Sequence, residues 1–165
     1  MRRPVLYVET SVFGFYYDKR KENISKREAS IKLFDQIYKG LFDAYYSNVT
    51  LAEIEKAKGP DKRRKLLSLI SRYGIERLTE PENIEDVELL TTTLIEKKII
   101  PANKKDDALH LALAILSPQI DYLITWNYKH LANKNTFRQV KVVALSQRYE
   151  VKFEVATPEE VIYYE

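Results

Sequence analysis

Four acidic side chains and one amide stand beside predicted strand ends and helix starts, although they lie far apart in the sequence. Glu9 directly follows the first predicted strand, and Glu53 lies in the first turn of the helix predicted after the second. Asp106 and Asp107 open an apolar helix before the fourth predicted strand, and Asn127 closely follows that strand. Ligands of open α/β sheets bind outside the carboxyl ends of the strands. We therefore expect these side chains to meet at one end of one sheet.

A cluster of carboxylates favours a bound divalent cation. Two carboxylates about 4 Å apart repel each other by roughly 4 kcal/mol at an effective dielectric of 20, so either some are protonated or a cation lies among them. Mg²⁺ prefers oxygen ligands and is usually held by one or two carboxylates. It also lowers the pKa of its bound water and stabilises charge on a phosphoryl oxygen. The pattern therefore favours metal-dependent phosphodiester hydrolysis.

The composition excludes several other chemistries. The 165 residues contain no cysteine, which excludes a disulfide framework, a thiol nucleophile and a thiolate metal site. The two histidines, His110 and His130, are too few for a histidine-rich metal site, and four glycines are too few for a glycine-rich phosphate loop. A formal net charge of +3 and a pI near 8.9 weakly favour a polyanionic partner.

Simpler structural roles compete with metal binding at most of these positions. Thr50 and Glu53 fit a T-x-x-E capping box, in which the glutamate helps to start a helix. Either Asp106 or Asp107 fits a helix N-cap, and we expect one to cap while the other points into the site. Asn127 fits the N-cap of the turn that follows it. These alternatives stay open at the level of the sequence.

Glu9 is the hardest of these residues to explain structurally, because a charge at the end of a buried strand is unusual unless it is paired or binds a cation. His110 lies one turn into the apolar helix, where we expect a hydrogen-bonded core residue rather than a ligand. The hydroxyls of Thr10, Ser11 and Thr125 lie next to the strand ends and are candidates to orient a water or a phosphate.

The elements that must position these residues alternate between short β-type runs and helical patterns. Predicted strands cover residues 4–8, 44–47, 75–79, 121–125 and 141–145. Predicted helices cover residues 25–41, 81–97 and 108–116. Two further helices begin at Thr50 and at Pro60, and the second of these ends at Gly74. A short helix starts over residues 157–160. This alternation implies βαβ units, and hence a mostly parallel sheet with helices on both faces.

The length and the even composition predict a single domain over residues 1–165, because no linker divides the pattern. No stretch reaches the roughly 18 uninterrupted apolar residues of a membrane span. Glu9 also interrupts the apolar N-terminal run before it reaches the length of a signal-peptide core. We expect a cytoplasmic protein with no membrane association.

The sequence resembles the PIN-domain family, and especially the VapC-like toxins of bacterial and archaeal toxin–antitoxin pairs. The matching segments, in chain order, are LYVETSVFGFYYD, SNVTLAEIEKAKGPD, DDALHLALAI, DYLITWNYKHLAN and VATPEEV. The resemblance implies a PIN-like three-layer α/β sandwich, in which helices flank a central, mostly parallel sheet. It also implies dependence on Mg²⁺ or Mn²⁺, endoribonuclease activity and neutralisation by a small antitoxin protein.

The resemblance also implies roles for individual residues. It places metal ligands at Glu9, Glu53 and Asp107, and a fourth catalytic residue at Asn127. The family usually has Asp at the first and fourth of these positions. Glutamate is one methylene longer and is expected to shift the metal rather than abolish its binding, while asparagine offers a neutral oxygen. A subset of the family carries these ETSV and TWN forms.

Two functions are consistent with these features. The first is a metal-dependent endoribonuclease, the toxin of a type II toxin–antitoxin pair, in which a water activated by Mg²⁺ or Mn²⁺ hydrolyses RNA phosphodiester bonds. The alternative is a non-catalytic PIN-like module that binds RNA or protein and has a weakened metal site. For the first, we expect a homodimer whose helix over residues 25–41 offers an apolar groove to the antitoxin.

An RNA partner requires a basic surface, and basic residues occur in three clusters. These are residues 19–21, residues 56–65 with Lys56, Lys58, Lys62, Arg63, Arg64 and Lys65, and residues 97–105 with Lys97, Lys98, Lys104 and Lys105. Tyr16, Tyr17 and Trp126 are candidates to stack on unpaired bases, although core packing is the simpler role of each.

Overall fold

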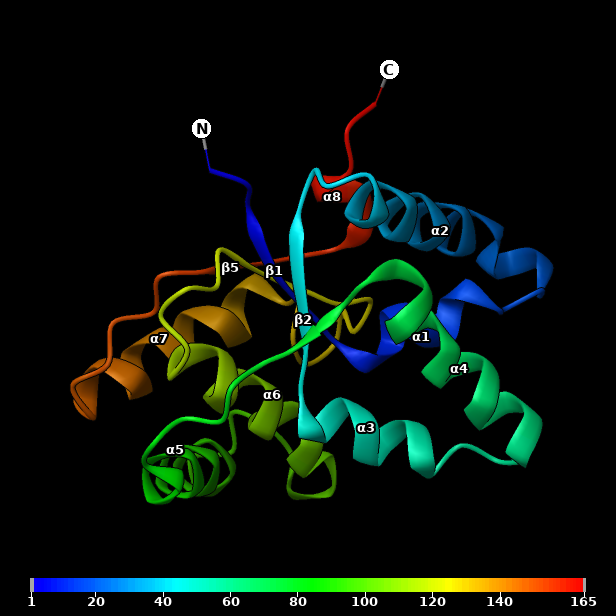
Figure 1. Cartoon of the computed structure of the whole chain (residues 1–165). Helices are drawn as coiled ribbons and strands as arrows, with labels where there is room; N and C mark the ends of the chain where they lie inside the picture. The colour runs from blue at the N-terminus through cyan, green and yellow to red at the C-terminus, as the bar shows by residue number, and fades with distance from the viewer. Residues whose placement is uncertain (1, 165) are drawn as a thin grey trace.

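A five-stranded parallel sheet forms the middle layer of the protein, which a computed structural model describes over residues 2–164 (Figure 1). The strand order is β3-β2-β1-β4-β5. The bounds are β1 Val5–Val8, β2 Asp43–Tyr46, β3 Glu76–Arg77, β4 Tyr122–Ile124 and β5 Glu154–Ala156. All four strand pairings are parallel, so the carboxyl ends of the strands share one edge of the sheet. The predicted parallel α/β architecture is confirmed.

Helices cover both faces of this sheet (Figure 1). One face carries α5 Ile84–Glu96, α6 Lys105–Ile115 and α7 Lys134–Ser146, and the other carries α1 Thr10–Tyr16, α2 Ile24–Tyr38, α4 Pro60–Tyr73 and α8 Pro158–Val161. Helix α3, Asn48–Glu55, lies at the carboxyl ends of the strands and contacts α1, α4 and α6. Short 3-10 turns, Lys21–Asn23 and Ala102–Lys104, precede α2 and α6. Within residues 2–164, no helix has the length and apolar character needed to cross a membrane.

Four of the predicted strands are confirmed, and the fifth is wrong. Residues 141–145 lie inside α7, where Val140, Val143 and Ala144 are buried at helical spacing and Asn133 caps the first turn. A short apolar run does not by itself distinguish a strand from a buried helix segment. The fifth strand is β5, which lies in the C-terminal stretch just before the predicted helix start at α8.

The predicted helices are present with shifted ends. Helix α4 begins at Pro60 as predicted and ends at Gly74, whose φ of 68° is a left-handed conformation that glycine adopts without strain. Helix α2 follows the N-cap Asn23 and ends at Tyr38, whereas the predicted helix covers residues 25–41. Helix α1 was not predicted, because its seven residues are too few to establish a helical period.

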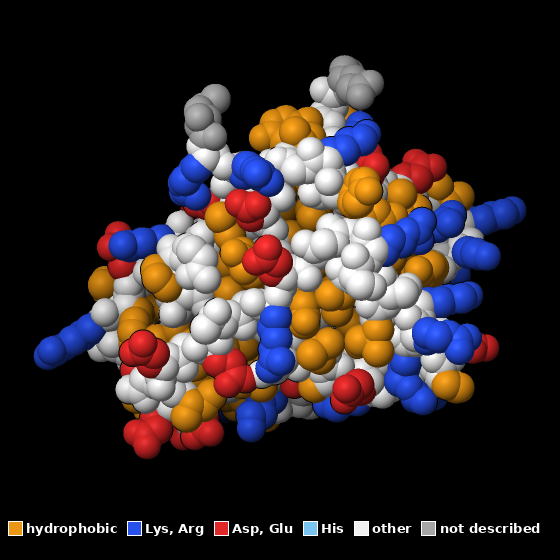
Figure 2. Space-filling view, in the orientation of Figure 1, with side chains coloured by type: hydrophobic (Ala, Val, Ile, Leu, Met, Phe, Trp, Pro, Cys, Tyr) orange, Lys and Arg blue, Asp and Glu red, His pale blue; other side chains and the backbone are white. Residues whose placement is uncertain are grey.

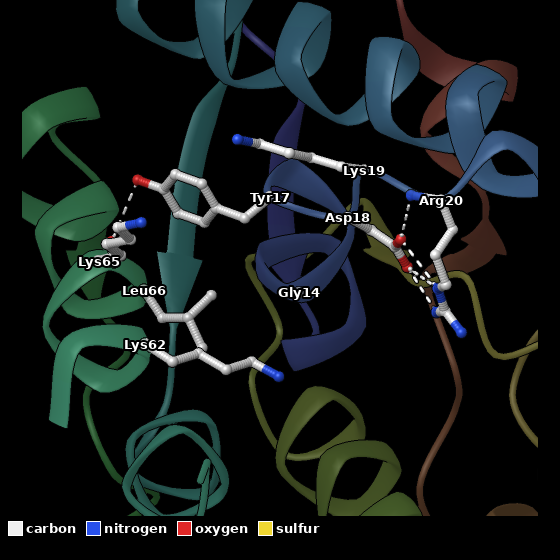
Figure 3. A pocket seen from close by; sticks show the side chains of 8 residues that line it. All are labelled: Gly14, Tyr17, Asp18, Lys19, Arg20, Lys62, Lys65 and Leu66. Atoms are coloured by element: carbon white, nitrogen blue, oxygen red, sulfur yellow. Dashed lines mark hydrogen bonds and ion pairs between the residues drawn. The ribbon is translucent and has the colours of Figure 1, made fainter. Parts of the chain in front are cut away.

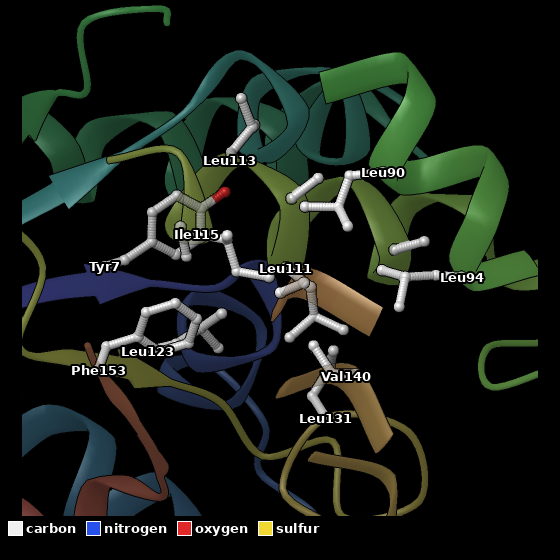
Figure 4. Packing of buried hydrophobic residues seen from close by; sticks show 14 of the residues in the cluster. Tyr7, Leu90, Leu94, Leu111, Leu113, Ile115, Leu123, Leu131, Val140 and Phe153 are labelled. Carbon is white, nitrogen blue, oxygen red and sulfur yellow. The ribbon is translucent and has the colours of Figure 1, made fainter. Parts of the chain in front are cut away.

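Helix α6 is held against the sheet by close apolar packing. Figure 4 shows Leu111 of α6 between Leu90 and Leu94 of α5 on one side and Leu123 of β4 on the other, with Val140 of α7 beside it. Each of these side chains is at most 1% exposed, and truncating such a leucine to alanine typically costs about 2–5 kcal/mol. This packing fixes α6, and so determines where the acidic residues at its N-terminus point.

Asp121 ties the chain before β1 to the start of β4. Its carboxylate accepts two hydrogen bonds from the Arg2 guanidinium and one from the backbone N–H of Val5, each at 2.8 Å. The Arg2 hydrogen bonds, supported by the one from Val5, lower the pKa of Asp121 although partial burial opposes them.

Asp121→Asn is expected to lower the free energy of unfolding at neutral pH by about 1 kcal/mol, the usual net value for a partly exposed interaction of this kind. The folded-state pKa is depressed, so the contribution is present above the unfolded-state pKa of about 3.9 and disappears as the pH falls through the lower folded-state value. Urea denaturation of both proteins should therefore show a stability difference that closes in strong acid. A difference of equal size at neutral and acid pH would contradict this role.

Candidate metal centre

The structure brings the predicted site residues to the carboxyl end of the sheet. Glu9 follows β1 and is the N-cap of α1, and Glu53 lies on α3, which follows β2. Asp107 lies in the first turn of α6, and Asn127 follows β4. Helices and strands that are distant in the sequence thus present these polar side chains to one region.

The capping box predicted for Thr50 and Glu53 is wrong. Ser47 is the N-cap of α3, and its hydroxyl accepts from the backbone N–H groups of Val49 and Thr50 at 3.1 and 3.4 Å. The Thr50 hydroxyl accepts in return from the Ser47 N–H at 3.3 Å. Glu53 therefore lies in the last turn of α3, not the first, and its carboxylate has no capping role.

Glu9 is a buried carboxylate whose hydrogen-bond donors are neutral. The residue is 4% exposed, and its carboxylate accepts from the Ser11 backbone N–H at 3.0 Å, the Ser11 hydroxyl at 2.6 Å and the Thr125 hydroxyl at 2.5 Å. His110 Nε2 lies farther away, 4.0 Å from Glu9 Oε2. The hydroxyls of Ser11 and Thr125 thus orient Glu9, whose charge is buried beside α1.

His110 connects Glu53 to the core of the protein. Its Nε2 lies 2.5 Å from Glu53 Oε1, and its Nδ1 lies 2.6 Å from the Tyr7 hydroxyl. The same hydroxyl lies 2.7 Å from Ser47 Oγ, and Thr10 donates to Glu53 Oε1 at 2.7 Å. Glu53 Oε1 therefore accepts both of the hydrogen bonds found for this carboxylate within residues 2–164.

The His110–Glu53 contact favours the charged forms of both side chains. Burial by itself lowers the pKa of His110, but the contacts with Tyr7, Glu53 and Glu9 outweigh burial and raise this pKa well above its ordinary value. Burial likewise raises the pKa of Glu53, and the hydrogen bonds from His110 and Thr10 outweigh it, so that the pKa is lowered overall. His110 Nε2 thus contacts Glu53 directly and lies farther, at 4.0 Å, from Glu9.

Asp107, rather than Asp106, points into the site. Asp107 is 8% exposed, and its Oδ2 accepts from Asn127 Nδ2 at 3.0 Å. The Asp106 side chain is 39% exposed and lies 3.7 Å from Lys56 Nζ. Burial, and then repulsion from Glu9, raise the pKa of Asp107. Helix α6 has no side-chain cap hydrogen bond, so the prediction that one of these aspartates caps it is wrong.

The oxygen and the nitrogen of the Asn127 carboxamide each make one hydrogen bond. Its Oδ1 accepts from the backbone N–H of His130 at 3.1 Å, which stabilises the turn after β4 as the cap interpretation predicts. Its Nδ2 donates to Asp107. The amide therefore presents a donor to the acidic cluster, and its oxygen is engaged in the turn.

The arrangement suits a divalent cation. One ligand atom from each of Glu9, Glu53 and His110 lies within 4.8 Å of the other two. The carboxylates of Glu9 and Asp107 are both buried, repel one another and accept hydrogen bonds from neutral donors. Such unbalanced buried negative charge is costly unless it is paired or binds a metal. Carboxylate oxygens are the ligands that Mg²⁺ and Mn²⁺ prefer.

His110 is the residue of this group that was not included in the predicted site. It is fully buried and hydrogen-bonded, as predicted for a core residue, yet its Nε2 faces Glu53. His110 follows Asp107 by three residues, and residues at this spacing lie on one face of a helix. That spacing is the signal by which the sequence indicates a second polar residue facing the site.

Comparison with known proteins supports the fold. No protein-family model matches the sequence, and no curated protein matches it either. The chain is similar to a chain in the crystal structure of VapBC2 from Rickettsia felis bound to a DNA fragment from their promoter, with a TM-score of 0.58 and 17% identity over 93% of this chain and 98% of that one. It is also similar to a chain of VapBC-1 from nontypeable Haemophilus influenzae, with a TM-score of 0.52 and 17% identity over 82% and 93% of the two chains. The predicted PIN-like fold is confirmed.

Proposed function

We propose that this protein is a metal-dependent endoribonuclease and the toxin of a type II toxin–antitoxin pair. The observation that carries the proposal is the pair of carboxylates of Glu9 and Glu53, which have oxygens within 4.8 Å of one another, with the buried carboxylate of Asp107 close enough to Glu9 to be repelled by it. The sequence resemblance to VapC-like toxins and the fold shared with chains of two VapBC structures support it.

Glu9, Glu53 and Asp107 would hold Mg²⁺ or Mn²⁺. When bound, such a cation polarises a phosphoryl oxygen and offsets the charge that develops on it. The chain itself supplies preorganisation, because each carboxylate is oriented by at least one donor from another part of the fold: Thr125 for Glu9, Thr10 and His110 for Glu53, and Asn127 for Asp107. Oriented ligands need little rearrangement when the cation and the substrate bind.

The direct test is cleavage of single-stranded RNA by the purified protein with Mn²⁺, with Mg²⁺ and with EDTA, alongside its melting temperature in each condition. We expect cleavage and a rise in melting temperature with either metal, because a ligand that binds the folded state stabilises it. RNA binding without metal-dependent cleavage would instead identify the non-catalytic binding module.

Asn127→Asp is expected to have opposite effects with and without metal. Without metal, the new carboxylate faces Asp107 and replaces a hydrogen-bond donor, so the melting temperature should fall. With Mn²⁺, the added charge should enlarge the metal-induced rise in melting temperature. Gln139→Glu, the same change of amide to carboxylate at an exposed position on α7, is the control for the charge change itself. An unchanged response to Mn²⁺ would place Asn127 outside the metal centre.

We further propose a single cytoplasmic domain that forms a homodimer and binds a small antitoxin. Ile24 and Tyr38, at the two ends of α2, are 50% and 70% exposed and give this helix an apolar surface. An amphipathic helix of the antitoxin would bury such side chains. Size-exclusion chromatography with light scattering, before and after addition of the co-expressed partner, measures both associations.

A further inference from the structure

A basic cleft lies between α1 and α4. Its volume is about 570 Å³, and its lining consists of Gly14, Tyr17, Asp18, Lys19, Arg20, Lys62, Lys65 and Leu66 (Figure 3). Four cationic side chains and one carboxylate give this lining a formal charge of +3, which equals the net charge of the whole chain. The remaining charged residues of the chain sum to a formal charge of zero. Figure 2 likewise shows Lys and Arg side chains gathered over α2 and α4.

Asp18 does not neutralise the lysines of the cleft. Its carboxylate accepts from Arg20 Nε at 3.0 Å, from Arg20 Nη2 at 2.6 Å and from Asn23 Nδ2 at 2.9 Å. The hydrogen bonds from Arg20 hold the pKa of Asp18 well below its usual range. The ion pairs described within residues 2–164 give no carboxylate partner to Lys19, Lys62 or Lys65.

Helix α1 connects the cleft to the acidic cluster, because one face of this helix carries residues of both. Thr10, Gly14 and Tyr17 share one face of α1, because residues three and four apart are neighbours on a helix. Thr10 donates to Glu53 at 2.7 Å, whereas Gly14 and Tyr17 line the cleft. Tyr17 lies about 10 Å along the helix axis from Thr10 at 1.5 Å per residue. That distance is the length of about three stacked nucleotides at 3.4 Å each.

We propose that this cleft binds the phosphodiester backbone of single-stranded RNA and leads the strand into the acidic cluster. The inference rests on the proposed function and adds where the RNA lies. Lys19, Lys62 and Lys65 supply positive charge for the phosphates. The Tyr17 hydroxyl donates to the carbonyl of Lys65 at 3.3 Å, which holds the ring in the wall of the cleft as a surface for a base. Charge alone would also attract an acidic peptide, but the position of the cleft on the same face of α1 as Thr10, which contacts Glu53 of the proposed nuclease site, favours RNA.

Gly14 allows the charge of the cleft to be changed without disturbing the fold. A Cβ added there meets no atom within 4 Å, so a longer side chain enters open space. Gly14→Glu and Gly14→Gln add side chains of similar size and helix propensity that differ by one negative charge. Binding of a short fluorescein-labelled single-stranded RNA is measured by anisotropy in EDTA. We expect the Kd of Gly14→Glu to exceed that of Gly14→Gln by about tenfold or more, and a ratio near one would overturn the proposal.

The salt dependence of binding identifies the lysines that contact phosphate. Lys62→Ala combined with Lys65→Ala should reduce the slope of log Kd against log salt by about 1.4, because each neutralised phosphate contributes about 0.7. The control combines Arg64→Ala with Lys152→Ala and removes the same amount of positive charge. Neither residue lines the cleft: Arg64 forms an ion pair with Asp61 at 2.5 Å, and Lys152 is an exposed residue before β5. Equal slopes for the two double variants would overturn the assignment.

These experiments test the RNA-binding role of the cleft and the proposed nuclease activity independently. The Gly14 variants in EDTA report on the cleft, and Mn²⁺-dependent cleavage by the unmodified protein reports on the proposed function. Charge-dependent RNA binding without cleavage would support the cleft and reject the nuclease. Cleavage together with equal RNA affinity of Gly14→Glu and Gly14→Gln would reject the cleft alone. Tighter binding of a polyglutamate peptide than of RNA would also overturn the proposed ligand.

Discussion

Glu53→Gln is expected to lower the rate of Mn²⁺-dependent RNA cleavage by about 10²-fold or more and to remove most of the Mn²⁺-induced rise in melting temperature. The amide retains an oxygen for the hydrogen bonds from Thr10 and His110, but it carries no charge for a hard cation. Metal stabilisation of a phosphoryl transition state amounts to several kcal/mol, and each 1.36 kcal/mol is a factor of about ten in rate.

The same substitution should lower the stability of the metal-free protein by about 2 kcal/mol, since it leaves the buried His110 without its charged partner. Glu55→Gln is the matched control, because Glu55 lies on the same helix but is exposed. It should leave cleavage, metal response and stability close to those of the unmodified protein. Full Mn²⁺-dependent cleavage by Glu53→Gln would mean that the metal centre is wrongly assigned.

Tyr7→Phe is expected to lower the free energy of unfolding in EDTA by roughly 2–4 kcal/mol. The Tyr7 ring is fully buried, and its hydroxyl bridges His110 Nδ1 and Ser47 Oγ. Phenylalanine fills the same space but leaves both groups without this partner, and a buried polar group left unpaired costs about 1–3 kcal/mol. Urea denaturation measures the loss directly.

Tyr45→Phe is the control for Tyr7→Phe. Tyr45 lies opposite Tyr7 in the parallel pairing of β1 and β2, and its hydroxyl makes no hydrogen bond among those described for residues 2–164. Its loss should change stability by a few tenths of a kcal/mol, the usual range for a substitution that breaks no buried contact. Equal effects of the two substitutions would show that the bridge between His110 and Ser47 is not a significant source of stability.

Glu53→Gln and Tyr7→Phe test successive parts of one hydrogen-bond network. Tyr7 orients His110, and His110 orients Glu53 toward Glu9. If the network positions the metal ligands, Tyr7→Phe should also weaken the response of the melting temperature to Mn²⁺, although Tyr7 itself is not a ligand. A purely structural role for Tyr7 would lower stability while leaving the metal-induced rise unchanged.

The sequence by itself determined the architecture, because buried strands and amphipathic helices have distinct local patterns. Nearby residues determine the strand at β1, the helix start at Pro60 and the helix end at Gly74, and all three predictions are confirmed. Residues 141–145 were assigned wrongly because a short apolar run suits both a strand and a buried helix, and packing against the rest of the core decides between them.

The sequence also determined which residue types stand at the carboxyl ends of the strands, because that placement follows from the order of strands and helices. Only the tertiary structure decided which side chains meet. The choice of Asp107 over Asp106 depends on the rotation of α6 against the sheet, and the contact of His110 with Glu53 joins side chains 57 positions apart. Likewise, the basic residues near 19 and near 62 form one cleft because α1 packs against α4. Such contacts depend on distances across the folded chain, which no local pattern of residues contains.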